Sequence, residues 1–141
     1  MTKRKNSRAK GKRSELEARD LLRRCGIHDA ERGARNGVKS GADIHSPMLA
    51  EQGIRVEVKN VSAMRLGGKL WRDACMQAHD DSLRGPPPKM GPRRLEHWFL
   101  LWRPCRGEWA VTAPTDYGWT TITGEAGISQ WINDTILKGA Q

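Results

Sequence analysis

The sequence predicts a single α/β domain in which a mixed sheet of about five strands is flanked by helices. Three patterns support this: helical spacing of apolar residues within 14–25, strict alternation over 54–59, and a continuous apolar run over 98–102, directly after His97. The first pattern indicates an amphipathic helix, the second a strand with one buried face, and the third a strand buried on both faces. A chain of 141 residues is long enough to bury one core.

The first predicted helix covers residues 14–25. Its apolar stripe consists of Ala18, Leu21, Leu22 and Cys25, at i, i+3, i+4 and i+7. Ser14 is a suitable N-cap, and Gly26 is a suitable residue to end the helix. A weak strand follows over 27–33, and then a loop rich in glycine and basic residues, which either approaches a phosphate or is only a flexible turn.

Two strands are predicted next, over 42–46 and 53–59, joined by a polar loop around Pro47. In the second strand Glu57 and Lys59 point the same way, about 7 Å apart at roughly 3.3 Å per residue. Pairing of the two strands would bring Asp43 opposite Glu57, where facing side chains lie about 5 Å apart.

The remaining elements alternate between helix and strand. A helix over 70–80 has an apolar face, and residues 83–94 contain too many prolines for regular structure. Strand 97–102 is expected to be central, with strand 108–113 beside it and a last helix over 128–138. The residues expected to face inward from the two helices are Trp71, Ala74, Cys75, Ala78, Ile128, Trp131, Ile132 and Thr135.

Charge is concentrated at the N-terminus. The net charge is +9, and residues 1–13 contain seven bases and no acid, which leaves +2 for the rest of the chain. We therefore expect a flexible basic arm over 1–13, which orders against a polyanion, and a folded domain over 14–141. A solubilising tail is the alternative. The seven bases are Lys3, Arg4, Lys5, Arg8, Lys10, Lys12 and Arg13.

Other function classes are disfavoured. No apolar run of about 18 residues is present, so neither a transmembrane helix nor a membrane partner is expected. Cys25, Cys75 and Cys105 are odd in number and widely spaced, which argues against a disulfide framework or a zinc knuckle and favours the reducing cytoplasm.

The carboxylates of Asp43 and Glu57 would repel each other unless a positive group lay between them. A divalent cation with hard oxygen ligands is the natural candidate, and with Lys59 beside it this is the layout of a metal-dependent phosphodiesterase. An ordinary surface ion pair is the alternative for Glu57 and Lys59. Glu15 lies at the edge of the first helix's stripe, where it either complements the helix dipole or takes part in the site.

At these motifs the chain resembles the PD-(D/E)xK nuclease superfamily, and within it the archaeal-type Holliday junction resolvases and their phage relatives. The resemblance rests on Gly11 to Glu15, on Arg35 eight residues before Asp43, and on the segments 41–44 and 56–59. It covers about residues 10–60, and Ala42 stands where the superfamily name has proline.

The resemblance implies a restriction-endonuclease-like fold and a Mg²⁺ site, with Mn²⁺ able to substitute. Asp43, Glu57 and the Val58 carbonyl would bind the metal, Glu15 would hold a second metal or a metal-bound water, and Lys59 would act on the attacking water and the phosphate. It also implies a homodimer that cuts opposing strands of a four-way junction. Arg35 and Ser40 would contact the scissile region. From the residues themselves, Lys39, Gln77, Arg84 and Lys89 are further expected DNA contacts, Arg72 could approach a substrate, and Arg93 and Arg94 add to the basic surface of the 83–94 loop.

The leading hypothesis is therefore a Mg²⁺-dependent endonuclease that resolves four-way DNA junctions. Two alternatives stay open. One is another nuclease of the same superfamily, of the restriction, flap-cutting or nicking kind. The other is a non-catalytic nucleic-acid-binding protein whose carboxylates are ordinary surface charges.

Overall fold

The computed structural model describes residues 2–33, 43–60, 64–84, 98–103, 107–115 and 118–138, with the backbone alone for 2–10 and 83–84. These residues form a six-stranded sheet in the order β1-β2-β3-β4-β5-β6. The strands are β1 (Glu31–Arg32), β2 (Ile44–His45), β3 (Arg55–Lys59), β4 (Trp98–Trp102), β5 (Ala110–Thr115) and β6 (Gly118–Thr123). The central pair β3–β4 is parallel and the other pairs are antiparallel, which confirms an α/β domain with a mixed sheet.

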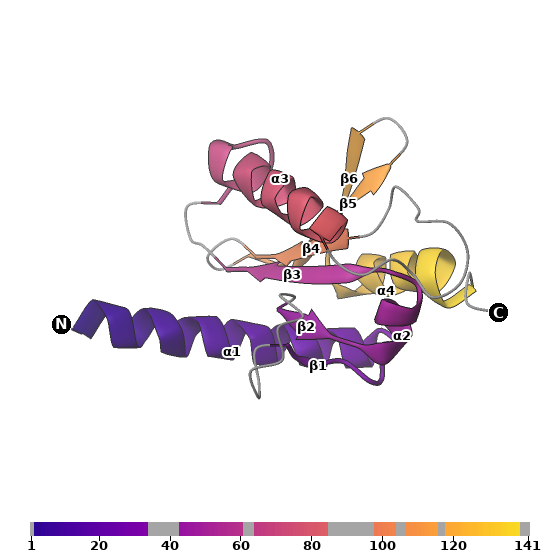
Figure 1. Cartoon of the computed structure of the whole chain (residues 1–141), viewed down its shortest axis with the longest axis horizontal. Helices are drawn as coiled ribbons and strands as arrows, with labels where there is room; N and C mark the ends of the chain where they lie inside the picture. The colour runs from indigo at the N-terminus through magenta and orange to yellow at the C-terminus, as the bar shows by residue number, and fades with distance from the viewer. Residues whose placement is uncertain are drawn as a thin grey trace.

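Helices cover both faces of this sheet. They are α1 (Thr2–Arg24), α2 (Pro47–Glu51), α3 (Lys69–Arg84) and α4 (Glu125–Ile132), which continues as a π-helical segment, Asn133–Leu137. Figure 1 shows α1 and α3 on opposite sides of β3. Among the residues described, no helix is long and apolar enough to cross a membrane.

The two faces of the sheet carry separate cores. Val56 and Val58 of β3 pack with α1, α2 and α4 in the larger core, whereas Trp98 and Leu100 of β4 pack with α3 in the smaller one. Because side chains alternate along a strand, Arg55, Glu57 and Lys59 lie on the α3 face. The sequence predicted one buried face for this strand, but α3 also covers the other.

Helix α1 confirms the predicted stripe, since Ala18, Leu21, Leu22 and Cys25 are all buried. Gly26 follows the helix with a φ of 111°, a left-handed conformation that glycine adopts without strain, so the predicted stop is also confirmed. The predicted N-cap is wrong. The helix begins at Thr2, and Ser14 is a buried residue inside it.

The loop predicted around Pro47 is instead the short helix α2. Ser46 is its N-cap, accepting a hydrogen bond from the Leu49 N–H at 3.2 Å, and Pro47 occupies the first helical position. Asp29 accepts from the Ser46 hydroxyl and from the Met48 N–H. Proline therefore starts a helix here, because the capping residue directly before it satisfies the first free N–H groups.

The later helices confirm their predicted inward faces with two corrections. Leu83 and Arg84 belong to α3, so the segment without regular structure begins later than predicted, and residues 85–97 lie outside the described part. At the C-terminal end Thr135 is exposed and Ile136 is buried. A π-helical turn contains more residues than an α-helical turn, which shifts the inward position by one residue.

Buried tryptophans on the α3 face share one acceptor. The indole N–H groups of Trp71 and Trp102 both donate to Thr112 Oγ1, at 3.1 and 2.9 Å. The Thr112 hydroxyl therefore directs its own proton to Thr121 Oγ1, 2.9 Å away. This network joins α3 to β4, β5 and β6 inside the smaller core.

We expect Thr112→Val to lower the free energy of unfolding by about 2–5 kcal/mol, because two buried indole N–H groups lose their acceptor. Thr112→Ser keeps the acceptor and should cost about 1 kcal/mol for the lost methyl group. Chemical denaturation measures both values, with Thr123→Val on an exposed position of β6 as the control. Equal losses for the Val and Ser variants would contradict the shared-acceptor role.

Candidate functional site

The pairing of β2 with β3 fixes the position of Asp43. Ile44 lies opposite Val56, and the Asp43 N–H donates to the Val56 carbonyl at 3.2 Å. The Asp43 carboxylate then accepts a hydrogen bond from the Val58 N–H, with Oδ2 at 2.8 Å. One step further along this register, Asp43 faces Glu57, and both side chains lie on the α3 face.

Glu57 is held in a nearly closed environment. Its side chain is 13% exposed, and its carboxylate accepts a hydrogen bond from Arg55 Nε at 2.8 Å; the Arg55 side chain is 15% exposed. Burial raises the pKa of Glu57 to about 8, and the charge of Asp43 and a hydrogen bond between the two carboxyl groups add to this effect. The Arg55 guanidinium opposes the rise without reversing it. Near neutral pH the two carboxyl groups therefore hold a proton between them, unless another cation takes its place.

A backbone oxygen completes this group of possible ligands. Val58 directs its N–H toward Asp43, and Val56 directs its carbonyl the same way. N–H and C=O groups of one residue point to the same side of a strand, so the Val58 carbonyl also faces the Asp43 side of β3. Two carboxyl groups and one carbonyl are oxygen donors of the type that Mg²⁺ prefers.

Lys59 ends β3 two residues after Glu57 and on the same face. Its backbone carbonyl accepts from the Arg103 N–H at 3.1 Å, and its strand partner on β4 is Trp102. The parallel pairing with β4 therefore fixes the backbone of Lys59 at the end of β3, two residues from Glu57.

Glu15 lies on the other side of the sheet. It accepts from Arg32 Nε at 2.7 Å, in an ion pair with side chains 19% and 22% exposed. Arg32 pairs with Ile44, whose side chain belongs to the α1 face. Within the described residues no group of three or more His, Cys, Asp or Glu side chains is placed to hold a metal. The four predicted site residues are thus divided into Asp43, Glu57 and Lys59 on one face and Glu15 on the other.

A hydrogen bond still connects α1 to the end of β3. Asn60 follows Lys59, and its side-chain amide donates to Ser14 Oγ at 2.8 Å. Because Ser14 directly precedes Glu15, the start of the buried half of α1 lies at the Lys59 end of the strand. Glu15 is therefore near this end, although it is bound to Arg32.

The expected DNA contacts divide between described and undescribed residues. Lys12 and Arg13 are exposed on α1, and Arg72 and Gln77 are exposed on α3. Arg35, Lys39, Ser40, Lys89, Arg93 and Arg94 lie outside the described residues, as do the side chains of Lys3, Arg4, Lys5, Arg8, Lys10 and Arg84.

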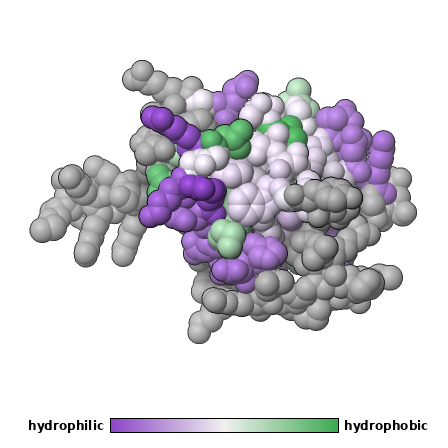
Figure 2. Space-filling model, turned by 90° about the horizontal axis from the view of Figure 1, so that it is seen from above, coloured by the Kyte–Doolittle hydropathy of each residue, from purple (hydrophilic) through white to green (hydrophobic). Residues whose placement is uncertain are grey.

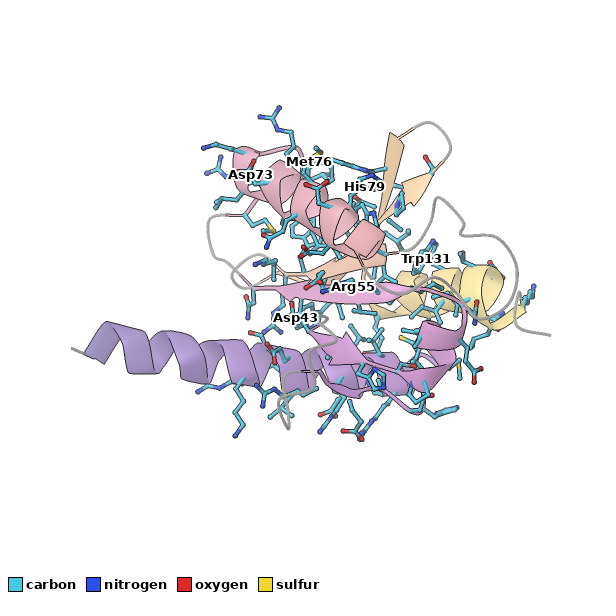
Figure 3. All side chains as sticks on the ribbon, in the orientation of Figure 1. Asp43, Arg55, Asp73, Met76, His79 and Trp131 are labelled. Atoms are coloured by element: carbon cyan, nitrogen blue, oxygen red, sulfur yellow. The ribbon has the colours of Figure 1, made fainter. Side chains whose placement is uncertain are left out.

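Sequence reasoning missed Arg55 as part of the site. Figure 3 labels Arg55 and Asp43 beside β3, between α1 and α3. Arg55 also donates to the Asp81 carbonyl of α3 at 3.5 Å, so it links Glu57 to the helix that covers this face. The signal was present in the sequence, since Arg55, Glu57 and Lys59 alternate along one strand and must share a face.

No protein-family model, curated protein or solved structure matches this chain.

In chelator, we expect the melting temperature to fall as the pH rises from about 5 to 9. The pKa of Glu57 is raised to about 8 in the folded state, so its protonated form stabilises the fold at low pH and this contribution disappears as Glu57 ionises. The effect is on the order of a few kcal/mol. Glu57→Gln cannot ionise and should flatten the profile. Parallel profiles for the two proteins would show that Glu57 is not the responsible group.

Proposed function

We propose that this chain is a divalent-metal-dependent DNA endonuclease that cuts four-way junctions. The observation that carries the proposal is the partly buried carboxyl pair of Asp43 and Glu57, with Lys59 on the same strand face and the pKa of Glu57 raised to about 8. Strongly shifted carboxyl groups beside a lysine are typical of catalytic sites.

The donor set fits a hard divalent cation. Asp43, Glu57 and the Val58 carbonyl offer oxygen atoms from two adjacent strands, and a cation would relieve the repulsion that a proton now relieves. We propose Mg²⁺, with Mn²⁺ able to substitute. Glu15 would join as a further ligand only after leaving Arg32.

Hydrolysis needs water to attack phosphorus while the bond from phosphorus to the leaving oxygen breaks and that oxygen gains a proton. When bound, the metal would supply charge neutralisation and a more acidic water. The Lys59 ammonium would hold the attacking water or a non-bridging phosphate oxygen and offset the negative charge of the transition state. Asp43 is kept in place for this reaction by its bond to the Val58 N–H.

The choice of branched DNA rests on charge and on the resemblance of residues 10–60. A net charge of +9 favours association with polyanions, and a junction can be recognised through its phosphates and its shape. We further propose that two copies act together, because symmetric resolution requires two cuts in opposing strands.

Asp43→Asn should reduce cleavage of a labelled junction at least a thousandfold, because a charged ligand is lost, while binding in chelator is retained. The matched control is Asp73→Asn, which removes the same charge from an exposed position of α3 (Figure 3) and should leave the rate within twofold. Gel assays with Mg²⁺ and with chelator measure both effects.

Metal binding gives a readout independent of cleavage. Added Mg²⁺ should raise the melting temperature of the wild type at pH 8 and should not raise that of Asp43→Asn. Cleavage by Asp43→Asn at the wild-type rate would refute the site assignment and favour a non-catalytic nucleic-acid-binding protein.

A cut-site map tests the substrate. On a four-way junction beside a plain duplex of the same sequence, we expect paired, symmetric incisions near the branch point and at least a hundredfold slower cutting of the duplex. Equal cutting of the two substrates would point instead to a restriction-like nuclease, and single incisions would point to a flap-cutting or nicking enzyme.

A further inference from the structure

The N-terminal half of α1 is a helix with a single sign of charge. Helix α1 runs without a break from Thr2 to Arg24. All seven bases of residues 1–13 precede its first acid, Glu15. Figure 1 shows this half of α1 running past the sheet and away from the rest of the molecule. The sequence predicted a flexible arm here, whereas the backbone is helical.

The other half of α1 anchors this extension. Leu21, Leu22 and Ala18 are buried in the larger core, and Ser14 is bonded to Asn60 beside the end of β3. A helix extended from a folded segment needs no new nucleation, which is the costly step of helix formation. The direction of the extension is therefore set by the folded domain.

Local sequence both supports and opposes this helix. Lysine, arginine and alanine have high helix propensity, whereas Gly11 is unfavourable by about 1 kcal/mol relative to alanine. Like charges four residues apart, as in Arg4 and Arg8, repel, and bases near a helix N-terminus oppose the helix dipole. A polyanion alongside the helix would offset both the repulsion between the bases and their unfavourable interaction with the helix dipole.

We infer that residues 2–13 bind the phosphate backbone of a duplex DNA arm as a rigid helix continuous with α1. This rests on the proposed DNA-cleaving function. From Ser14 to Lys3 a helix rises about 16 Å. At about 3.4 Å per nucleotide this spans roughly five phosphates, measured from the Lys59 end of the site. The helix thus places its charges at a fixed distance from the cut.

The outer surface of α3 is a poorer candidate for this contact. Figure 2 views the molecule from the α3 side, where hydrophilic areas lie beside near-neutral surface and a few hydrophobic side chains. Exposed Lys69 and Arg72 are offset there by exposed Asp73 and Asp80. Among the described segments, the start of α1 has the more uniform positive charge.

Variants at Gly11 separate helicity from charge. A Cβ at Gly11 meets nothing within 4 Å, so Gly11→Ala strengthens the helix without a clash. Gly11→Pro breaks the helix, and Ala9→Gly weakens it. None of the three changes the charge, and Gly11 is exposed.

We expect Gly11→Ala to tighten binding of a four-way junction in chelator by about two- to fivefold. Ala9→Gly should weaken it by a similar factor, and Gly11→Pro by about tenfold or more. Fluorescence anisotropy over a salt series measures affinity, circular dichroism measures helix content, and thermal melts should show intact domains. Deletion of residues 1–10 is the reference for loss of the whole extension and should flatten the salt dependence.

Equal affinities for the wild type and the three variants, together with weak binding by the deletion, would overturn the rigid helix and leave a flexible basic arm. Unchanged binding by the deletion would remove the extension from the DNA contact altogether. Neither result bears on the cleavage of DNA by the carboxyl pair, which Asp43→Asn tests separately.

Discussion

The hydrogen bond from the Val58 N–H to the Asp43 carboxylate couples the sheet to the candidate site. The backbone pairing of β2 with β3 ends next to Asp43. Beyond this point the Val58 N–H of β3 donates to the Asp43 side chain instead of to a backbone carbonyl of β2. The same bond directs Asp43 to the face that carries Glu57 and Lys59. Two carboxyl groups are thereby held together in a partly buried place, and the raised pKa of Glu57 follows from that burial and proximity.

The sheet itself decides which charged groups can meet. Arg55, Glu57 and Lys59 lie under α3, whereas Glu15 and Arg32 lie on the α1 side. Glu57 and Glu15 each form an ion pair with an arginine, Glu57 with Arg55 and Glu15 with Arg32. Because these pairs are largely buried, each arginine both satisfies a carboxylate and competes with any metal for it.

Helix α1 joins the core beside the carboxyl pair to the basic N-terminal segment. Its second half contributes the stripe that packs on Val56 and Val58, and Ser14 is bonded to Asn60 directly after Lys59. Its first half carries the bases. One continuous helix therefore links the backbone of the basic segment to the end of β3.

The sequence alone determined the elements with strong periodicity. It also determined that Glu57 and Lys59 share one face of their strand. The stripe of α1, the buried strand β4 and the alternation that puts Glu57 and Lys59 on one face depend only on neighbours along the chain. The tertiary structure decided the rest. The strand β6, rich in threonine and paired with β5, was missed because its pattern is weak and its partner stabilises it. The separation of Glu15 from Glu57, and the pairing of each with an arginine, depend on which face of the sheet α1 covers, and no local pattern encodes that choice.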